Sequence, residues 1–180
     1  MTTYISMLRG INVGGQKKIQ MEALRSLYTT LGLANVRSYV QSGNVVFDSD
    51  EQSPATIAGR IQAHIERSFG FAVLVFVRGV PNFQRVLSGN PFLKANADPA
   101  RLHVTFLYSP PSQAALSSLS LPAARDDQFS TGEQVVYLFC PNGYGKTRFS
   151  NDFFERKLNV PATTRNWNTV NTLFDLANER

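Results

Sequence analysis

The hydrophobic positions in the first half of the chain predict four strands and two helices. Short apolar or alternating runs, which are typical of strands, occupy residues 3–8, 35–41, 44–47 and 72–77. Helices are predicted where apolar residues recur three and four positions apart, at Leu24, Leu27, Tyr28 and Leu31, and at Ile57, Ile61, Ile65 and Phe69. Ser53-Pro54 and Gly70 are expected to begin and end the second helix. The order β-α-β-β-α-β is that of a ferredoxin-like unit.

The same order of elements is predicted again in the second half. Strands are expected at residues 102–108, 127–130, 134–140 and 162–165. Helices are expected at residues 112–119 and 151–158, with Ser112 and Ser150 as their caps, before a last helix that carries Val170, Leu173, Phe174 and Ala177 on one face. A short helix at 81–88 and a Gly/Asn/Pro-rich stretch at 88–100 separate the halves.

These elements predict an α+β protein of two tandem ferredoxin-like subdomains, each an antiparallel sheet with helices on one face. The predicted limits are 1–79 for the N-terminal subdomain, 80–100 for a short helix and linker, and 101–180 for the C-terminal subdomain with the final helix. The similarity of the halves lies in the order of elements, since no residue-level repeat is visible.

The composition favours a cytoplasmic protein with anionic partners. The chain has 180 residues and is 43% hydrophobic, enough for a packed core. No stretch has the roughly 18 uninterrupted apolar residues of a membrane span, and the N-terminus lacks the pattern of a secretory signal. Cys140 is the only cysteine, which excludes an intramolecular disulfide and a zinc site built on several thiolates. The net charge of +5 suits phosphates, nucleotides or nucleic acid.

Four segments combine glycine, asparagine and basic residues at the junctions between elements. The first, residues 9–18, joins a predicted strand to a helix, where free backbone N–H groups and the helix N-terminus attract anions. The second, Gln41–Asn44, is either a plain hairpin turn or a source of amides beside the first segment. The third, residues 141–147, ends in Gly-Lys-Thr, but Cys140 replaces the first glycine of a P-loop, so only a looser anion-binding loop is predicted. The fourth, residues 162–170, runs into the last helix.

In this fourth segment Asn166 or Asn168 is either a helix cap or a ligand group, and Trp167 is either a core residue or a donor to a ligand. Arg165 supplies charge for a phosphate or carboxylate. Taken together, the segments predict a ligand-binding surface made of Arg9, Asn12, Gly14, Gly15, Lys17, Gln41, Ser42, Asn44, Lys146, Arg165, Asn166, Trp167 and Asn168.

The sequence assigns no catalytic residues, metal ligands or cofactor. Two separated histidines make no metal motif, and Ser42 lacks the context of a hydrolase nucleophile. The leading hypothesis is therefore the binding of a small anionic or nucleotide-like ligand. The alternatives are nucleic-acid binding on an exposed sheet carrying aromatic residues such as Phe76 and Phe106, and an enzyme of unrecognised type with His103 among its first suspects. No oligomeric state is assigned, and no membrane partner is expected.

Three long blocks carry a resemblance to a known family: LRGINVGG, YVQSGNVVF and ERKLNVPATTRNWNTV. With these blocks the chain resembles the bacterial domain-of-unknown-function 1697 family from Tyr4 to about Leu176. The resemblance implies a fold of two ferredoxin-like subdomains. It implies no activity and no catalytic residues.

Overall fold

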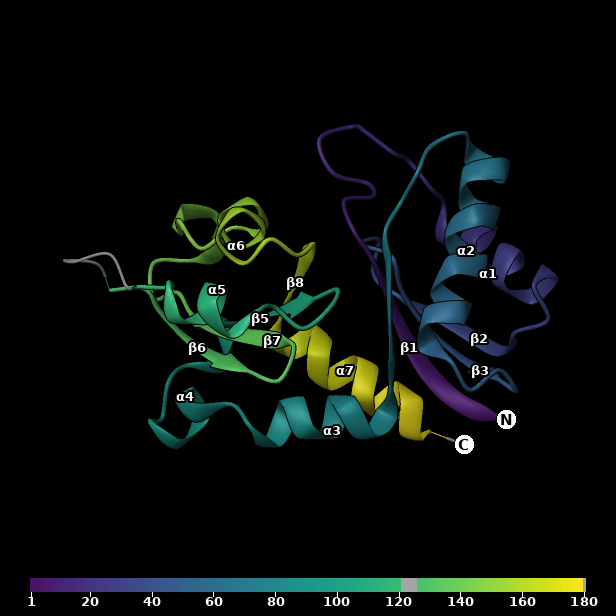
Figure 1. Ribbon diagram of the computed structural model, residues 1–180. Helices are drawn as coiled ribbons and strands as arrows, with labels where there is room; N and C mark the ends of the chain where they lie inside the picture. Colours follow the sequence, from purple (N-terminus) through teal and green to yellow (C-terminus); the bar gives the residue numbers. More distant parts are fainter. Residues whose placement is uncertain (121–125, 180) are drawn as a thin grey trace. The chain divides into compact units, whose positions relative to one another are not determined.

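The computed structural model describes residues 1–120 and 126–179 and contains two four-stranded antiparallel sheets (Figure 1). The chain divides into two compact units, Met1–Gln84 with Thr172–Arg180, and Arg85–Asn171. The predicted α+β class with two ferredoxin-like subdomains is confirmed. The predicted subdomain limits at 79/80 and 100/101 stay a prediction.

The first unit has the element order β-α-β-β-α-β. Its elements are β1 (Thr2–Leu8), α1 (Met21–Thr30), β2 (Ala34–Tyr39), β3 (Asn44–Ser49), α2 (Pro54–Phe69) and β4 (Val75–Gly79). The strand order β2-β3-β1-β4 places β1 and β3 at the centre of the sheet. Both helices lie on one face of this sheet (Figure 1).

The core of the first unit lies between the sheet and the two helices. Tyr4 and Leu8 of β1 point into it, and α2 contributes Ile57, Ile61 and Ile65, each at most 4% exposed. Full burial of one such side chain is worth about 1.5–3 kcal/mol, so these positions account for the helix packing. The predicted ends of α2 are also found: the Ser53 hydroxyl accepts a hydrogen bond from the Thr56 N–H, and Gly70 ends the helix with φ 80°.

The second unit repeats this topology. Its elements are β5 (Leu102–Leu107), α5 (Gln113–Ser117), β6 (Gln128–Gly132), β7 (Val135–Phe139), the 3-10 helix η2 (Tyr144–Lys146), α6 (Asn151–Leu158) and β8 (Ala162–Asn166). The strand order is β6-β7-β5-β8. Ser112 and Ser150 cap α5 and α6 as predicted, each accepting a hydrogen bond from a backbone N–H three residues later.

The remaining elements are α3 (Val80–Ser88), α4 (Pro91–Lys94), the 3-10 helix η1 (Pro99–Arg101) and α7 (Trp167–Asn178). The stretch 88–100 is more ordered than its composition indicates. Asn90 caps α4, and Asp98 caps η1, each through a side-chain oxygen that accepts a backbone N–H.

Several predicted strands have different limits in the structure, and two of them bear on the candidate site. The strand predicted at 35–41 ends at Tyr39, because Val40 adopts φ 52° and leaves the extended conformation. The strand predicted at 72–77 begins at Val75 and runs to Gly79. The residues before it, Ala72–Leu74, line a cavity that is described below.

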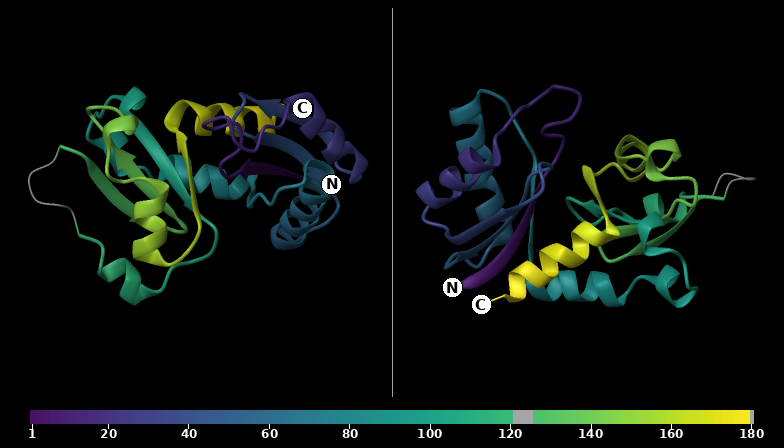
Figure 2. Two further views of the ribbon diagram at one scale, coloured as in Figure 1. Left: turned by 90° about the horizontal axis from the view of Figure 1, so that it is seen from above. Right: turned by 180° about the vertical axis from the view of Figure 1, so that it is seen from behind.

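The two units differ in the connection between their first strand and first helix. In the first unit this connection covers residues 9–20, whereas in the second unit it covers residues 108–112. The longer connection extends beyond the end of β1 as a loop (Figure 2). We call residues 9–18 of this connection the β1–α1 loop.

Gly43 sets how closely the β2–β3 turn approaches the β1–α1 loop. Its carbonyl accepts a hydrogen bond of 2.9 Å from the Leu8 N–H. A Cβ atom at Gly43 would lie 2.7 Å from Ile11 Cδ1 and 2.8 Å from Leu8 Cβ, and its φ of +79° is strained for other residues. Only glycine therefore fits this contact without displacing its neighbours.

We expect Gly43→Ala to lower the free energy of unfolding by about 2–4 kcal/mol, since it adds both overpacking and a left-handed alanine. Gly14→Ala is the matched control, because Gly14 also has a positive φ (+59°) but has open space around its Cβ position. Urea unfolding followed by circular dichroism measures both values. Equal losses in the two variants would contradict the close-approach explanation.

Candidate functional site: the cavity beside the β1–α1 loop

The β1–α1 loop contains a miniature hairpin. Val13 and Gln16 form an antiparallel bridge, and the Gln16 N–H donates to the Val13 carbonyl over 3.0 Å. Gly14 and Gly15 between them have φ values of 59° and 75°. A type I′ turn requires positive φ at both central positions. These two glycines therefore have a conformational role in the structure.

The side chain of Asn12 ties this loop to two other segments. Its Nδ2 donates to the Ile19 carbonyl over 2.9 Å and to the Gln41 carbonyl over 2.7 Å, and its Oδ1 accepts from the Ile19 N–H over 2.9 Å. The structure thus brings the first two predicted segments, 9–18 and 41–44, together within the first unit. Asn12 holds them in place.

The polar side chains of the β2–β3 turn serve the turn itself. Asn44 is fully buried, and its Nδ2 donates to the Tyr39 carbonyl over 3.1 Å and to the Ser42 hydroxyl over 2.9 Å. Gln41 is exposed. Of the predicted residues in this turn, Gln41 is the most exposed, Ser42 is half-buried and Asn44 is buried.

Arg9 and Lys17 of the β1–α1 loop line one cavity of about 520 Å³. Its other walls are α2 and the segment before β4, which contribute Gly59, Gln62, Ala63, Glu66, Ala72, Val73 and Leu74. The loop runs beside this segment (Figures 1 and 2). The Arg9 N–H donates to the Leu74 carbonyl over 2.9 Å, and the Lys17 Nζ donates to the Ala72 carbonyl over 2.8 Å.

Lys17 has an unusual backbone for a residue with a long side chain. Its φ is 44°, in the left-handed region that side chains other than those of Asn, Asp and Gly rarely adopt. The Asn12 N–H donates to the Lys17 carbonyl over 3.2 Å and closes the hairpin across this residue. The hydrogen bond to Ala72 holds the ammonium group at the cavity.

Sequence reasoning missed the α2 wall of this cavity. Gly59, Ala63 and Glu66 follow helical spacing on the face of α2 away from the core, and no role was predicted for them from the sequence. The available signal was a glycine and an alanine four residues apart, since small residues there leave room above the helix. The pattern of apolar residues, which marks the core, does not reveal such a surface.

The other predicted site residues belong to the second unit. Arg165 is 8% exposed, and its Nη1 donates to the Thr163 hydroxyl and the Thr164 carbonyl, both over 2.9 Å. Burial lowers the pKa of Arg165 to about 10, partly offset by Tyr144, so the guanidinium stays charged at neutral pH.

The residues that follow Arg165 begin α7. The Asn166 Oδ1 accepts the Thr169 N–H over 2.8 Å and caps this helix. Trp167 is 5% exposed, as expected of a core residue, whereas Asn168 is exposed. The cap bond and the burial agree with the structural interpretations of Asn166 and Trp167, and a ligand role for these residues stays a prediction.

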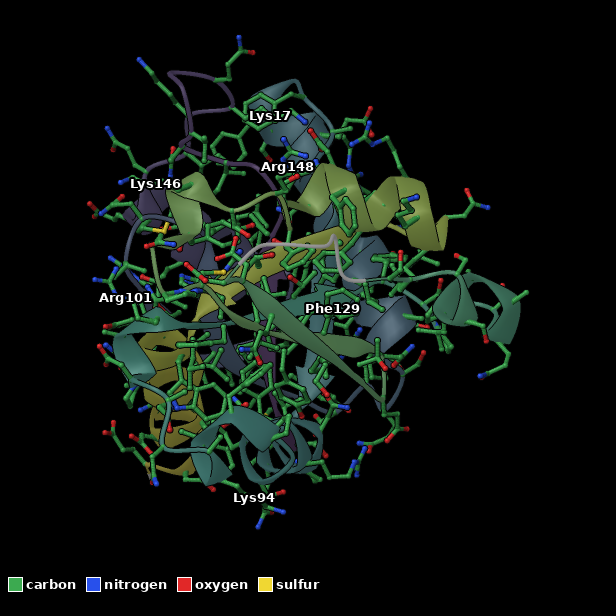
Figure 3. All side chains as sticks on the ribbon, turned by 90° about the vertical axis from the view of Figure 1, so that its left-hand side faces the viewer. Lys17, Lys94, Arg101, Phe129, Lys146 and Arg148 are labelled. Atoms are coloured by element: carbon green, nitrogen blue, oxygen red, sulfur yellow. The ribbon has the colours of Figure 1, made fainter. Side chains whose placement is uncertain are left out.

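The Gly-Lys-Thr segment forms the 3-10 turn η2. The Lys146 N–H donates to the Gly143 carbonyl, and the Thr147 N–H donates to the Tyr144 carbonyl, each over 3.1 Å. These two amide groups are used inside the turn. The side chain of Lys146 is exposed, on the same side of the second unit as Arg101 and Arg148 (Figure 3).

His103 packs against this turn. Its ring stacks on Tyr144 with the centroids 4.7 Å apart. Burial lowers the pKa of His103, and a hydrogen bond with the Arg101 backbone offsets part of this effect, so the imidazole is neutral at pH 7. On the neighbouring strand the Thr164 hydroxyl is 2.8 Å from the Thr105 hydroxyl and donates to the Asn151 Oδ1 over 2.7 Å.

The described residues give little support for a metal site, a membrane-spanning helix or an aromatic surface for nucleic acid. Residues 1–120 and 126–179 contain no group of three or more His, Cys, Asp or Glu side chains placed to hold a metal ion. Among the same residues, no helix has the length and apolar character needed to cross a bilayer. The strand aromatics Phe47, Phe76 and Phe106 are fully buried and do not offer a stacking surface.

The comparisons with known proteins agree with this fold. The model of the family described as "Protein of unknown function (DUF1697)" matches residues 1–137. The chain belongs to this family. The solved structure of the conserved bacterial protein SP0830 from Streptococcus pneumoniae is similar over 98% of both chains, with a TM-score of 0.76 and 26% sequence identity. No curated protein matches the chain. The DUF1697 match covers both loops that Asn12 joins.

The only cysteine of this DUF1697 chain has the properties of a core residue. Cys140 is fully buried. Burial and the negative charge of Asp127 raise the pKa of its thiol to about 11, and a hydrogen bond with Thr147 offsets part of this effect. A nucleophilic thiol requires the opposite shift.

This shift predicts a specific pH dependence of stability. The folded protein holds the thiol proton more tightly than the unfolded chain does. The protonated thiol therefore contributes its full stability below pH 9, and this contribution is lost as the pH rises towards 11. We expect the free energy of unfolding to fall more steeply over this interval in the wild type than in Cys140→Ala. Parallel curves in urea titrations at several pH values would show that the thiol is not perturbed.

Proposed function

We propose that the first unit binds a small anionic ligand in the cavity beside the β1–α1 loop. One observation carries the proposal: Arg9 and Lys17, from opposite ends of this loop, line the same cavity of about 520 Å³. Two cations at one concave site attract phosphate or carboxylate groups. A volume of this order suits a small metabolite, for which cavities of roughly 300–1,000 Å³ are typical.

The construction of the loop supports the proposal. Binding is strengthened when the recognising groups are already in place, because less conformational entropy is lost. Here the type I′ turn, the Asn12 amide and the close approach at Gly43 all fix the course of the loop. An ammonium group has three donors, so Lys17 can bind Ala72 and still donate to an anion.

Nucleic-acid binding on an open sheet is the less favoured function. That mode needs aromatic rings on an exposed sheet face, and Phe76 and Phe106 have no exposed surface. The basic charge of the chain is equally consistent with a small anion. Nucleotides fall within the proposed ligand class and belong in the first panel of compounds to be tested.

The test compares the two cavity cations with a neighbouring lysine. Inorganic phosphate and a set of nucleotides and carboxylates are titrated into the full chain at low ionic strength, where exposed charges are least screened. Amide chemical shifts in residues 9–18 and 59–74 report binding. We expect Arg9→Met and Lys17→Met each to weaken binding about tenfold, or roughly 1.4 kcal/mol, the size of a charge-assisted hydrogen bond.

Lys18→Met is the matched control. Lys18 is exposed and follows Lys17 directly, but it does not line the cavity. It should leave binding within about twofold of the wild type, since the net charge changes while the cavity does not. The proposal fails if none of the anions shifts these amides at millimolar concentration. It also fails if all three variants weaken binding equally, because this would indicate a nonspecific charge effect.

A further inference from the structure

The cavity beside the β1–α1 loop contains a carboxylate as well as two cations. Arg9 and Lys17 come from the loop, whereas Glu66 comes from α2 on a different wall. The remaining lining includes small or apolar side chains, among them Gly59 and Ala63. The cavity is therefore lined by charges of both signs, carried by separate elements of the first unit.

The position of Glu66 near the C-terminus of α2 is unfavourable for a carboxylate with respect to the helix dipole. Glu66 lies in the last turn of α2, whose capping residue Gly70 donates its N–H to the Glu66 backbone carbonyl. A negative charge near a helix C-terminus interacts unfavourably with the helix dipole, by about 0.3–1 kcal/mol at exposed sites. The Glu66 side chain is exposed, so burial offers no compensation. The helix dipole therefore does not account for this carboxylate, which lines the same cavity as Arg9 and Lys17.

Glu66 also opposes a ligand that is only anionic. Two like charges about 4 Å apart in water repel by about 1 kcal/mol, and the same energy favours opposite charges. A ligand with an anionic group and a cationic group can pair the first with Arg9 and Lys17 and the second with Glu66. Gly59 and Ala63, which also line the cavity, carry little or no side chain and leave its volume to the aliphatic part of a ligand.

We propose that the cavity selects a zwitterion: a small molecule with a carboxylate or phosphate at one end and a protonated amine at the other. This inference rests on the proposed function, because it assumes that Arg9 and Lys17 bind the anionic end. It adds that Glu66 binds the amine and sets the specificity. Since the three side chains differ in exposure and none is deeply enclosed, the selectivity is a few-fold rather than absolute.

The test uses three probes of similar length: γ-aminobutyrate, which carries both charges, butyrate, which carries the negative charge alone, and n-butylammonium, which carries the positive charge alone. Each is titrated into the full chain at low ionic strength, and amide chemical shifts in residues 59–74 give its dissociation constant. We expect wild-type protein to bind γ-aminobutyrate about three- to tenfold more tightly than either single-charge probe. O-Phosphoethanolamine, compared with γ-aminobutyrate, tells whether the anionic end is a phosphate or a carboxylate, and its comparison with inorganic phosphate repeats the test of the amine.

Glu66→Gln is the decisive variant, because it keeps the shape of the side chain and removes its charge. It should reduce the preference for γ-aminobutyrate over butyrate to about one, and it should leave the free energy of unfolding unchanged or slightly raised. Glu22→Gln is the control: Glu22 is an exposed residue of α1 that does not line the cavity. It should preserve the preference seen in the wild type.

The outcomes separate this inference from the proposed function. If inorganic phosphate binds but γ-aminobutyrate and O-phosphoethanolamine show no advantage over their single-charge counterparts, the zwitterion inference is wrong and the anion site stands. The same conclusion follows if the preference survives in Glu66→Gln. If phosphate, nucleotides and carboxylates all fail to bind, the proposed function is wrong, and the zwitterion inference with it.

Discussion

The candidate site of this protein depends on one steric constraint, the contact of Gly43 with Leu8 and Ile11. Because residue 43 has no side chain, the β2–β3 turn can lie against the start of the β1–α1 loop. That approach brings the Gln41 carbonyl to the Asn12 amide, which also holds Ile19 at the far end of the loop. Once both ends are fixed, Arg9 and Lys17 are directed to one cavity.

Much of the fold follows from local sequence signals. Ser53-Pro54 and Gly70 mark the ends of α2 because their physical effects are local: a side-chain oxygen replaces a missing backbone partner, and a residue without a Cβ accepts a positive φ. Ser150 acts in the same way at α6. The spacing of Ile57, Ile61 and Ile65 marks the buried face of the helix, because the hydrophobic effect acts on each residue according to the side it faces.

The site was only partly accessible to the same reasoning. The composition of the β1–α1 loop indicated Arg9 and Lys17, which do line a cavity. The small residues of α2 indicate only room above that helix, and not that Ala63 and Glu66 line the same cavity. The cavity forms because the segment that follows α2, residues 72–74, lies beside the β1–α1 loop, and this contact joins residues far apart in the sequence. Arg165 illustrates the reverse case. Its sequence context resembles an anion site, but its burial and its bonds to Thr163 and Thr164 depend on the packing of the whole second unit.

The unequal strand-to-helix connections of the two units have a consequence for how such a protein can change. Residues 108–112 show that this topology closes with a short connection, so most of residues 9–20 is an addition that the fold itself does not require. Two units with the same topology can differ in sequence and length at such a connection without a change in their sheets. Substitutions at the tip of the β1–α1 loop or at its cations can therefore change the specificity of the loop while the sheet and helices of the first unit stay intact. The short connection of the second unit is a position where such a loop can be inserted.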